Sequence, residues 1–562
     1  MIDFYYYDKL ASGYLTPMNV LWIMCDQLRF DYLGCSGHPH IRTPNIDRLA
    51  KEGVRFGQAY VQSTICGPSR MSAYTGRYVR SHGSTSNDAP LRIGEPTLGD
   101  HLREVGVDAV LIGKTHMIAD TEGMARLGID VDSLIGIRNS ECGFSPYVRD
   151  DGIHSVVGDN EPEYFTYLRN HGYDAENPWE AWANSAEGEN GDIVSGWFMR
   201  HAGKPARLPA HLTETAYITD RALDFMQERE GQSNWVAHVS YIKPHWPYIA
   251  AAPYHAMYGF DDVLPPVRDN AEQDHPNSIY RAFREERFSQ AFSRDDVRNT
   301  VIPTYMGLIS QIDDEIGRIV AYLKSTGQYE TTMIIISSDH GDYLGDHWLG
   351  EKQLFHDPSV RIPLIIRDPR KEADATRGTV SNDLVELIDI APTLLDFYAA
   401  EPKPHILEGR SLKPILEGFR PDDWRNYVIS EYNYREDRAY WSQQDLPDHP
   451  TIRMIADARW KLMHFEDQPP MLFDRRTDPQ ELFDVAHLPE YANVIADLLD
   501  KLFFWARNPK SDVCTPPGPL KEFSEQMRVY DAVAEMGFPI GYWHEDELET
   551  ELLKKKLYDK DQ

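Results

Sequence analysis

Two pairs of polar residues follow short apolar runs in distant parts of the chain. Asp26-Gln27 comes directly after the run at 19–25, and Asp339-His340 comes directly after the run at 333–338. Carboxylate and amide oxygens are hard metal ligands, and an imidazole is a common ligand of transition metals. The four side chains therefore predict a site for one divalent metal if the fold brings the pairs together. An isolated acidic pair after a strand is more often a helix cap, so the position of the two pairs in the fold decides whether they form a metal site.

A second segment, Cys66-Gly67-Pro68-Ser69-Arg70, has the features of a helix start. Pro68 suits the first turn of a helix, where free N–H groups and the positive end of the helix favour an anion. Arg70 lies one helical turn after Cys66, so both side chains are expected on one face, with the guanidinium able to hold substrate oxygens. A buried structural cysteine before a turn is the alternative.

Further basic residues occur in short segments of their own. Lys114 and His116 alternate along Gly113-Lys114-Thr115-His116, so both side chains can face one cavity. His245 stands between two prolines and is a candidate general acid, and Lys352 follows the second metal pair. Asn87 is a weaker candidate for substrate binding. Each of these residues, taken alone, is better explained as structural.

The segments between these residues alternate between strand and helix patterns. In a doubly wound sheet, ligands bind beyond the carboxyl ends of the strands, where both metal pairs would lie. The fold class that we predict is α/β, with a large doubly wound mixed sheet flanked by helices and a smaller C-terminal antiparallel sheet plus helix. The expected strands are 19–25, 108–112, 235–241 and 333–338, and the expected helices are 44–52, 97–104, 304–324 and roughly 489–507.

The pattern along the chain predicts four parts. They are an N-terminal extension at 1–17, a catalytic α/β domain at 18–420, a small α+β domain at 421–510 and a C-terminal arm at 511–562. Residues 121 to about 232 are expected to form an irregular insertion over one face of the sheet. The arm has too few apolar residues for a core of its own, so we expect it to pack on the body of the protein or on a second subunit, with a frayed tail as the alternative. The long arm also predicts self-association, as a homodimer.

Composition limits the possible partners. The chain has 57 Lys plus Arg against 89 Asp plus Glu, a formal net charge of −32, which argues against binding nucleic acid or anionic membranes. Its five cysteines give no reason to expect disulfides. No basic region precedes an apolar run at the N-terminus, and no apolar stretch has membrane-spanning length, so we expect a cytoplasmic protein.

The Cys66 segment and the following Thr75-Gly76-Arg77 resemble the C-x-P-S-R and T-G-R signature of formylglycine-dependent sulfatases, in the alkaline phosphatase superfamily. The resemblance implies that a formylglycine-generating enzyme oxidises Cys66 to the nucleophile, and that the substrate is a small sulfate ester. It further implies catalytic roles for Arg70, Lys114, His116, His245 and Lys352, substrate binding by Asn87, and a metal held by Asp26, Gln27, residue 66, Asp339 and His340.

Gln27 and His340 depart from the commonest sulfatase pattern, which has Asp and Asn there. They resemble the phosphonate monoester hydrolase branch instead. The amide leaves two anionic side chains around the ion in place of three, and an imidazole is a poor calcium ligand. Mn²⁺ is therefore the expected metal, with Ca²⁺ second and Zn²⁺ third.

The predicted function is an arylsulfatase-like hydrolysis of sulfate monoesters, with phosphonate monoesters or phosphodiesters as side substrates. Lys114 and His116 favour a group with three non-bridging oxygens, as a sulfate ester presents. Three alternatives stay open: a phosphonate monoester or phosphodiester hydrolase with the same site, a phosphatase-type enzyme with an unmodified nucleophile, and an inactive sulfatase-like binding module.

Overall fold

The computed structural model describes residues 18–155, 161–442, 448–510, 543–547 and 549–550. The predicted N-terminal extension at 1–17 and most of the predicted arm at 511–562 lie outside this range. Both large sheets belong to one compact unit, which includes the described residues up to Pro509 apart from Lys403–Ile406. The independence of a domain starting near 421 stays a prediction.

An eight-stranded sheet forms the centre of this unit, in the order β10-β2-β9-β8-β1-β7-β3-β4. Neighbouring strands run parallel except for β9, which is antiparallel to both β2 and β8. The prediction of a doubly wound mixed sheet is confirmed. The strands are β1 (Asn19–Asp26), β2 (Val54–Tyr60), β3 (Asp108–Gly113), β4 (Ser145–Arg149), β7 (Trp235–Pro244), β8 (Thr332–Ser338), β9 (Leu364–Arg367) and β10 (Thr379–Glu386).

The pairing of β1 with β8 decides where the site forms. The two strands are parallel neighbours, and Cys25 pairs with Ser338 at their carboxyl ends. Asp26 and Asp339 come next along each chain segment, so both begin at the same edge of the sheet. The continuous apolar runs that predicted these strands are buried on both faces, as is typical of a parallel sheet.

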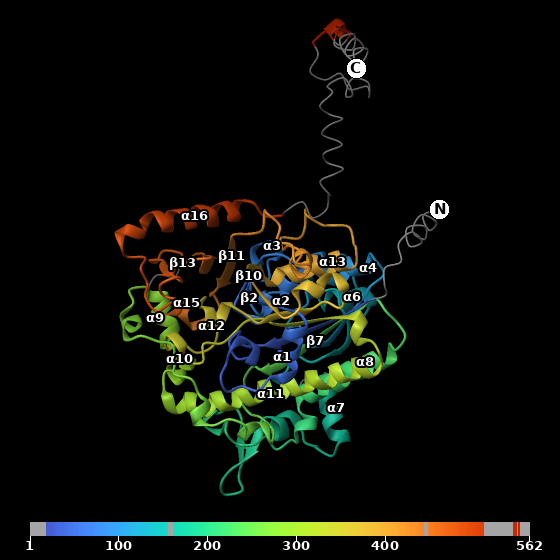
Figure 1. Cartoon of the computed structure of the whole chain (residues 1–562), viewed down its shortest axis with the longest axis vertical. Coiled ribbons are helices and arrows are strands. Elements are labelled where there is room, and N and C mark those ends of the chain that lie inside the picture. Colours follow the sequence, from blue (N-terminus) through green and yellow to red (C-terminus); the bar gives the residue numbers. More distant parts are fainter. Residues whose placement is uncertain (1–17, 156–160, 443–447, 511–542, 548, 551–562) are drawn as a thin grey trace. The chain divides into compact units, whose positions relative to one another are not determined.

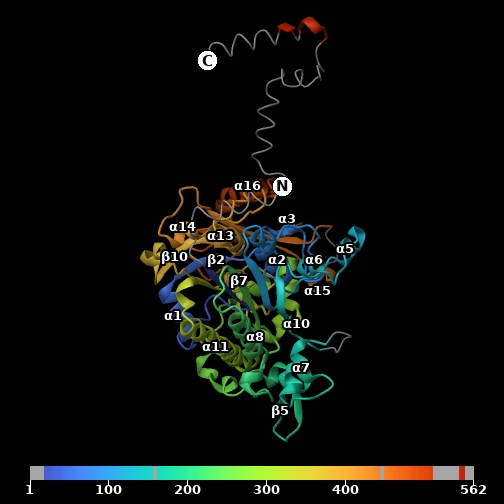
Figure 2. The ribbon, with the colours of Figure 1, turned by 90° about the vertical axis from the view of Figure 1, so that its right-hand side faces the viewer.

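Helices cover both faces of the sheet (Figures 1 and 2). Leu21 and Ile23 of β1 share a core with Ile312 of α11, whereas Trp22, which points the other way, contacts Tyr74 of α2 at 5.8 Å between ring centroids. One face carries α1 (Pro44–Glu52), α8 (Glu214–Glu228) and α11 (Asp295–Ser325); the other carries α2 (Cys66–Thr75), α4 (Leu98–Arg103) and α13 (Ile390–Phe397).

The segment predicted as an irregular insertion is more regular than expected. It supplies β4 to the edge of the main sheet and α8 to one of its faces. The prediction missed β4 because this five-residue edge strand is only partly buried and contains a proline. The other elements here are α5 (Thr121–Leu127), α6 (Leu134–Asn139), α7 (Glu163–Asn170), and the hairpin of β5 (Ser185–Glu187) and β6 (Ile193–Ser195).

The smaller C-terminal sheet is antiparallel, as predicted, and has the order β11-β12-β13-β14. Leu498 and Leu502 of α16 (Ala492–Arg507) pack against Ile455 and Leu462 of this sheet. Among the described residues, no helix combines the length and apolar character needed to cross a membrane. The strands are β11 (Tyr427–Asn433), β12 (Thr451–Asp457), β13 (Trp460–Phe465) and β14 (Met471–Asp474).

Further α-helices connect these elements. They are α3 (Val79–His82), α9 (Ser278–Glu285), α10 (Arg287–Phe292), α12 (Asp357–Val360), α14 (Lys413–Leu416) and α15 (Arg438–Trp441).

Candidate active site

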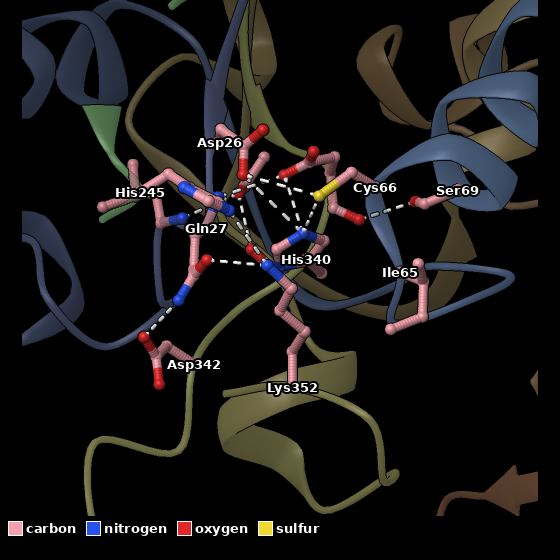
Figure 3. A network of polar contacts seen from close by, with 12 residues as sticks. Asp26, Gln27, Ile65, Cys66, Ser69, His245, His340, Asp342 and Lys352 are labelled. Atoms are coloured by element: carbon pink, nitrogen blue, oxygen red, sulfur yellow. Dashed lines mark hydrogen bonds and ion pairs between the residues drawn. The ribbon is translucent and has the colours of Figure 1, made fainter. Parts of the chain in front are cut away.

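The two predicted metal pairs converge beside the start of α2. Asp26, Cys66, Asp339 and His340 are all buried, and each offers one ligand atom within 4.8 Å of the others (Figure 3). Burial would lower the pKa of His340, but Asp339 and Cys66 raise it to about 9, so the surroundings attract positive charge. Two carboxylates and an imidazole fit a divalent transition ion.

Cys66 is the first residue of α2 and lies on this cluster. Its Sγ is 3.1 Å from His340 Nε2 and 3.8 Å from Asp26 Oδ1. The next residue, Gly67, donates its backbone N–H to Asn87 Oδ1 at 2.9 Å. Asn87 therefore satisfies one of the open N–H groups at the helix start. Its amide nitrogen can still donate to an anionic oxygen in the substrate contact that the sequence predicted.

Arg70 has no exposed surface and joins both metal-ligand carboxylates. Its Nε donates to Asp339 Oδ2 at 2.8 Å, and a terminal nitrogen contacts Asp26 Oδ2 at 3.2 Å. The other terminal nitrogen donates to Ser240 Oγ and to the backbone oxygen of Lys114, at 2.8 and 3.0 Å. A guanidinium has five N–H groups, so these contacts leave at most one for a substrate oxygen. Arg70 therefore supports both carboxylates, and the catalytic role that the sequence predicted for it stays a prediction.

Gln27 is held in an uncommon backbone conformation, with φ of 67°. Its N–H donates to Asp339 Oδ1 at 3.1 Å, and its carbonyl oxygen accepts the Tyr305 hydroxyl at 2.7 Å. Its side-chain Oε1 accepts from Lys352 Nζ at 2.9 Å, whereas Nε2 donates to Asp342 Oδ2 (Figure 3). Hydrogen bonds from neighbouring residues of the site therefore hold Gln27 in this strained backbone conformation.

Asp342 fixes which way the Gln27 amide faces. Its carboxylate also accepts from the Tyr248 hydroxyl at 2.9 Å and from the Leu344 N–H at 3.0 Å. A carboxylate surrounded by three donors can only accept, so it requires the nitrogen end of Gln27. The side-chain oxygen of Gln27 therefore faces Lys352, and an oxygen is the atom that a metal ligand must offer.

Lys114 and His116 lie beside Asp26 and Cys66, respectively. Lys114 Nζ is 2.6 Å from Asp26 Oδ2; burial would lower the pKa of this ammonium, but Asp26 and Cys66 raise it. The turn that carries His116 is anchored by Asp151, whose Oδ1 accepts the His116 N–H at 2.9 Å. The His116 side chain faces Cys66 and contributes to lowering its pKa.

His245 and Lys352 complete the surroundings of residue 66. Lys352 Nζ is 3.2 Å from His245 Nε2, and His245 Nδ1 is 2.7 Å from the Trp246 carbonyl oxygen. Because an ammonium only donates, Nε2 is the acceptor and Nδ1 carries the hydrogen. Burial, and next Lys352, lower the pKa of His245 to about 4. Lys243 Nζ holds the loop by donating to the carbonyl oxygens of His245 and Pro247, at 3.2 and 2.9 Å.

The combined field favours an anion at position 66. Burial would raise the pKa of the Cys66 thiol, but Lys352, His340 and Lys114 hold it well below its ordinary value. The same positive field would stabilise negative charge on an attacking oxygen.

Two histidines near Lys352 are bonded elsewhere. His347 and His356 stack with ring centroids 4.0 Å apart. His347 Nδ1 is 2.7 Å from Glu272 Oε1, and His356 Nδ1 is 2.8 Å from the Tyr343 hydroxyl. These bonds hold both rings against Glu272 and Tyr343, outside the candidate active site. Both histidines are therefore weaker candidates than His245 for the chemistry.

The sequence analysis missed the residues that hold the site in place. Ser69 Oγ donates to the Asp339 carbonyl oxygen at 2.6 Å and so ties α2 to the end of β8. Ser240, Asp151, Lys243 and Asp342 support Arg70, His116, His245 and Gln27 in turn. Ser69 lies within the Cys66 segment, and Lys243 and Asp342 lie two residues from His245 and His340. Ser240 and Asp151 lie in segments with no recognisable signal.

The doubly wound sheet carries a metal-ligand group and three buried cations at the carboxyl ends of its strands, next to a reactive side chain at a helix start. This combination defines a metal-dependent ester hydrolase. The Sulfatase family model matches residues 18–398, and the model of the N-sulphoglucosamine sulphohydrolase C-terminal region matches residues 345–507. The chain therefore belongs to the sulfatase family of the alkaline phosphatase superfamily, as the Cys66 motif predicted. Membership implies formylglycine derived from Cys66 and a metal site.

Relatives of this chain act on more than one kind of ester. The multifunctional alkaline phosphatase superfamily protein PehA of Trinickia caryophylli is 34% identical over 516 residues, covering 87% of this chain and 95% of PehA. The phosphonate monoester hydrolase SpPMH from Silicibacter pomeroyi is 30% identical with a TM-score of 0.77, covering 88% of this chain and 97% of that chain. The arylsulfatase of Clostridium perfringens (strain 13 / Type A) is 28% identical over 495 residues, covering 86% and 93%.

Replacing Asp339 by Asn should abolish metal binding at this site and activity with it, because one of two anionic ligands is lost. The measurement is metal content by mass spectrometry after dialysis, together with turnover of an aryl ester. Asp346→Asn is the control, since it breaks another buried carboxylate–arginine pair, with Arg29 at 2.8 Å, outside the metal group. Full metal content and activity in Asp339→Asn would remove Asp339 from the ligand set.

Replacing Asp342 by Asn should weaken metal binding by about 10–100-fold, the usual effect of removing a group that orients a ligand. An Asn amide can donate to Gln27, so the Gln27 amide can turn its nitrogen toward the site. Metal titration of the two proteins measures the change. Tyr248→Phe removes a donor to Asp342 without reversing Gln27 and should change metal affinity little; equal affinities of Asp342→Asn and the unchanged protein would contradict the assignment.

Proposed function

We propose that this sulfatase-family hydrolase cleaves sulfate monoesters, and phosphonate monoesters as a second substrate class, with formylglycine 66 as the nucleophile. The observation that carries the proposal is the set of buried cations, Arg70, Lys114 and Lys352, gathered around residue 66 with the carboxylates of Asp26 and Asp339. Such a site suits an anionic ester whose charge is spread over several oxygens. The multifunctional relative and the phosphonate hydrolase relative support the second substrate class.

Asp26, Gln27, Asp339 and His340 would hold the metal, which supplies Lewis-acid activation of the nucleophile when bound. Manganese is our proposal for its identity, ahead of calcium and zinc, because the set mixes hard oxygens with an imidazole. As formylglycine, residue 66 offers two hydroxyls when hydrated, one that attacks and one whose deprotonation later releases the transferred group.

Lys114 has hydrogen-bond donors left for the substrate. It uses one of its three N–H groups on Asp26, whereas Lys352 Nζ already contacts Gln27, His245 and Glu351 Oε2, the last at 3.3 Å. The remaining donors of Lys114 can bind non-bridging oxygens of the transferred group. Each such bond joins an ammonium to an anionic oxygen in a buried site, where charge-assisted bonds are strong.

His245 is our proposed general acid and His116 our proposed base for the second step. His245 is neutral at rest because burial and Lys352 lower its pKa to about 4. A bound anion opposes the effect of Lys352, so the imidazole gains a proton in the complex and can give it to the leaving oxygen. His116, whose side chain also faces residue 66, would take the proton of the second hydroxyl.

The active protein should carry formylglycine at position 66. Peptide mass spectrometry of the purified enzyme measures the modification, and Cys25, Cys35 and Cys142 serve as internal controls that should stay unmodified thiols. Activity should rise in proportion to the modified fraction. Full activity with only cysteine at position 66 would instead support an unmodified nucleophile.

Sulfate should be preferred to phosphonate when both esters carry the same nitrophenyl leaving group. A phosphonate replaces one non-bridging oxygen by an apolar substituent, which leaves a donor unpaired at a cost of about 1–3 kcal/mol. Lys114→Ala should therefore lower kcat/KM more for the sulfate ester than for the phosphonate ester. Lys324→Ala, a change in an exposed lysine of α11, is the control.

A reversed preference in the unchanged enzyme would make phosphonate monoester hydrolysis the main activity, which Gln27 and the two relatives favour. Equal losses in Lys114→Ala would show that Lys114 does not select the substrate.

A further inference from the structure

A second group of metal-ligating side chains lies outside the candidate active site. Asp150 follows β4, His154 lies in the loop after it, and Glu214 is the first residue of α8. Each offers one ligand atom within 4.8 Å of the others. Asp150 and Glu214 are only 3% and 5% exposed, so this group is enclosed by the protein and is no patch of solvated surface charge.

Two carboxylate oxygens in this group lack hydrogen-bond partners. His154 Nε2 and the Gly152 N–H both bond to Asp150 Oδ1, at 2.8 and 2.9 Å. Asp150 Oδ2 and Glu214 Oε1 are buried with no hydrogen-bond partner in the part of the chain that the structure describes. A buried acceptor without a partner destabilises the folded protein, more so when it is charged. A further group at this position would remove that destabilisation.

The nearby cation does not balance both carboxylates. Lys243 is the lysine that acts on Glu214, and its ammonium already donates to the backbone oxygens of His245 and Pro247. The basic group that contacts Asp150 is His154, whose Nε2 is 2.8 Å from Asp150 Oδ1.

We propose that Asp150, His154 and Glu214 form a second metal site, which binds a divalent transition ion such as zinc or manganese. Two carboxylates and one imidazole are a ligand set that such ions accept in proteins. A cavity of about 20 Å³ borders Glu214, Trp179 and Lys243, and this is room for one water molecule beside Glu214.

The position of this site gives the ion a structural role. The residue after Asp150 is Asp151, whose carboxylate accepts the backbone N–H groups of Thr115 and His116. Lys243, beside Glu214, holds the loop that carries His245. An ion that joins the end of β4 to the start of α8 therefore stabilises the two loops that carry His116 and His245.

Metal stoichiometry of the full-length protein tests the proposal. After exposure to excess Zn²⁺ or Mn²⁺ and gel filtration, the unchanged protein should retain about two ions per chain, and Asp339→Asn and Glu214→Gln about one each, since each lacks a different site. Glu228→Gln, at the other end of α8, is the matched control and should retain about two.

His154→Gln provides a second variant in case Glu214→Gln folds poorly. In the unchanged protein, the second ion should raise the Tm, and in His154→Gln this increase should be lost while the active-site ion stays bound. Retention of a single ion by the unchanged protein at saturating metal, with no rise in Tm from further metal, would show a hydrogen-bonded ion cluster only and overturn the proposal. Unchanged stoichiometry in both Glu214→Gln and His154→Gln would overturn it as well.

Discussion

Arg70 lies without exposed surface between the carboxylates of Asp26 and Asp339, and the candidate active site depends on this contact. The two carboxylates would repel each other in a buried position, and the guanidinium between them offsets that repulsion. Burying a charged group costs several kcal/mol unless its hydrogen bonds are replaced, and Ser240 and the Lys114 carbonyl oxygen replace them here. Asp26 ends β1, Ser240 lies in β7, Asp339 follows β8 and Lys114 follows β3. One side chain of α2 therefore joins four segments at this edge of the sheet.

This arrangement explains why the reactive residue stands where it does. The Arg70 side chain attaches α2 to the carboxylates at the sheet edge, and the Ser69 hydroxyl attaches it to the Asp339 carbonyl oxygen. Cys66, at the start of the helix, therefore faces the metal-ligand group. The cations that face residue 66 then act on whatever anion forms there. The Asp150 group extends the same principle to the outer loops, where a proposed ion would steady the supports of His116 and His245.

Much of this could be predicted from the sequence, for identifiable reasons. The strands that end at Asp26 and Asp339 are continuous apolar runs, and such runs in an alternating pattern indicate buried parallel strands. The Cys66 motif predicted the family because several fixed residues occur at fixed spacing. Conversely, the left-handed backbone of Gln27, the acceptor role of Asp342 and the support from Ser240 depend on tertiary contacts between distant segments. The strands β2, β4, β9 and β10 were not among the expected ones either. In the case of β4, partial burial leaves little hydrophobic pattern.

Anomalous X-ray diffraction from crystals of the mature, manganese-loaded enzyme, collected at the manganese absorption edge, tests the central claim most directly. The account predicts an anomalous peak bounded by Asp26, Asp339 and His340, with the side-chain oxygen of Gln27 and residue 66 as formylglycine turned toward it. Fully active crystals with no anomalous peak at that position would contradict the account.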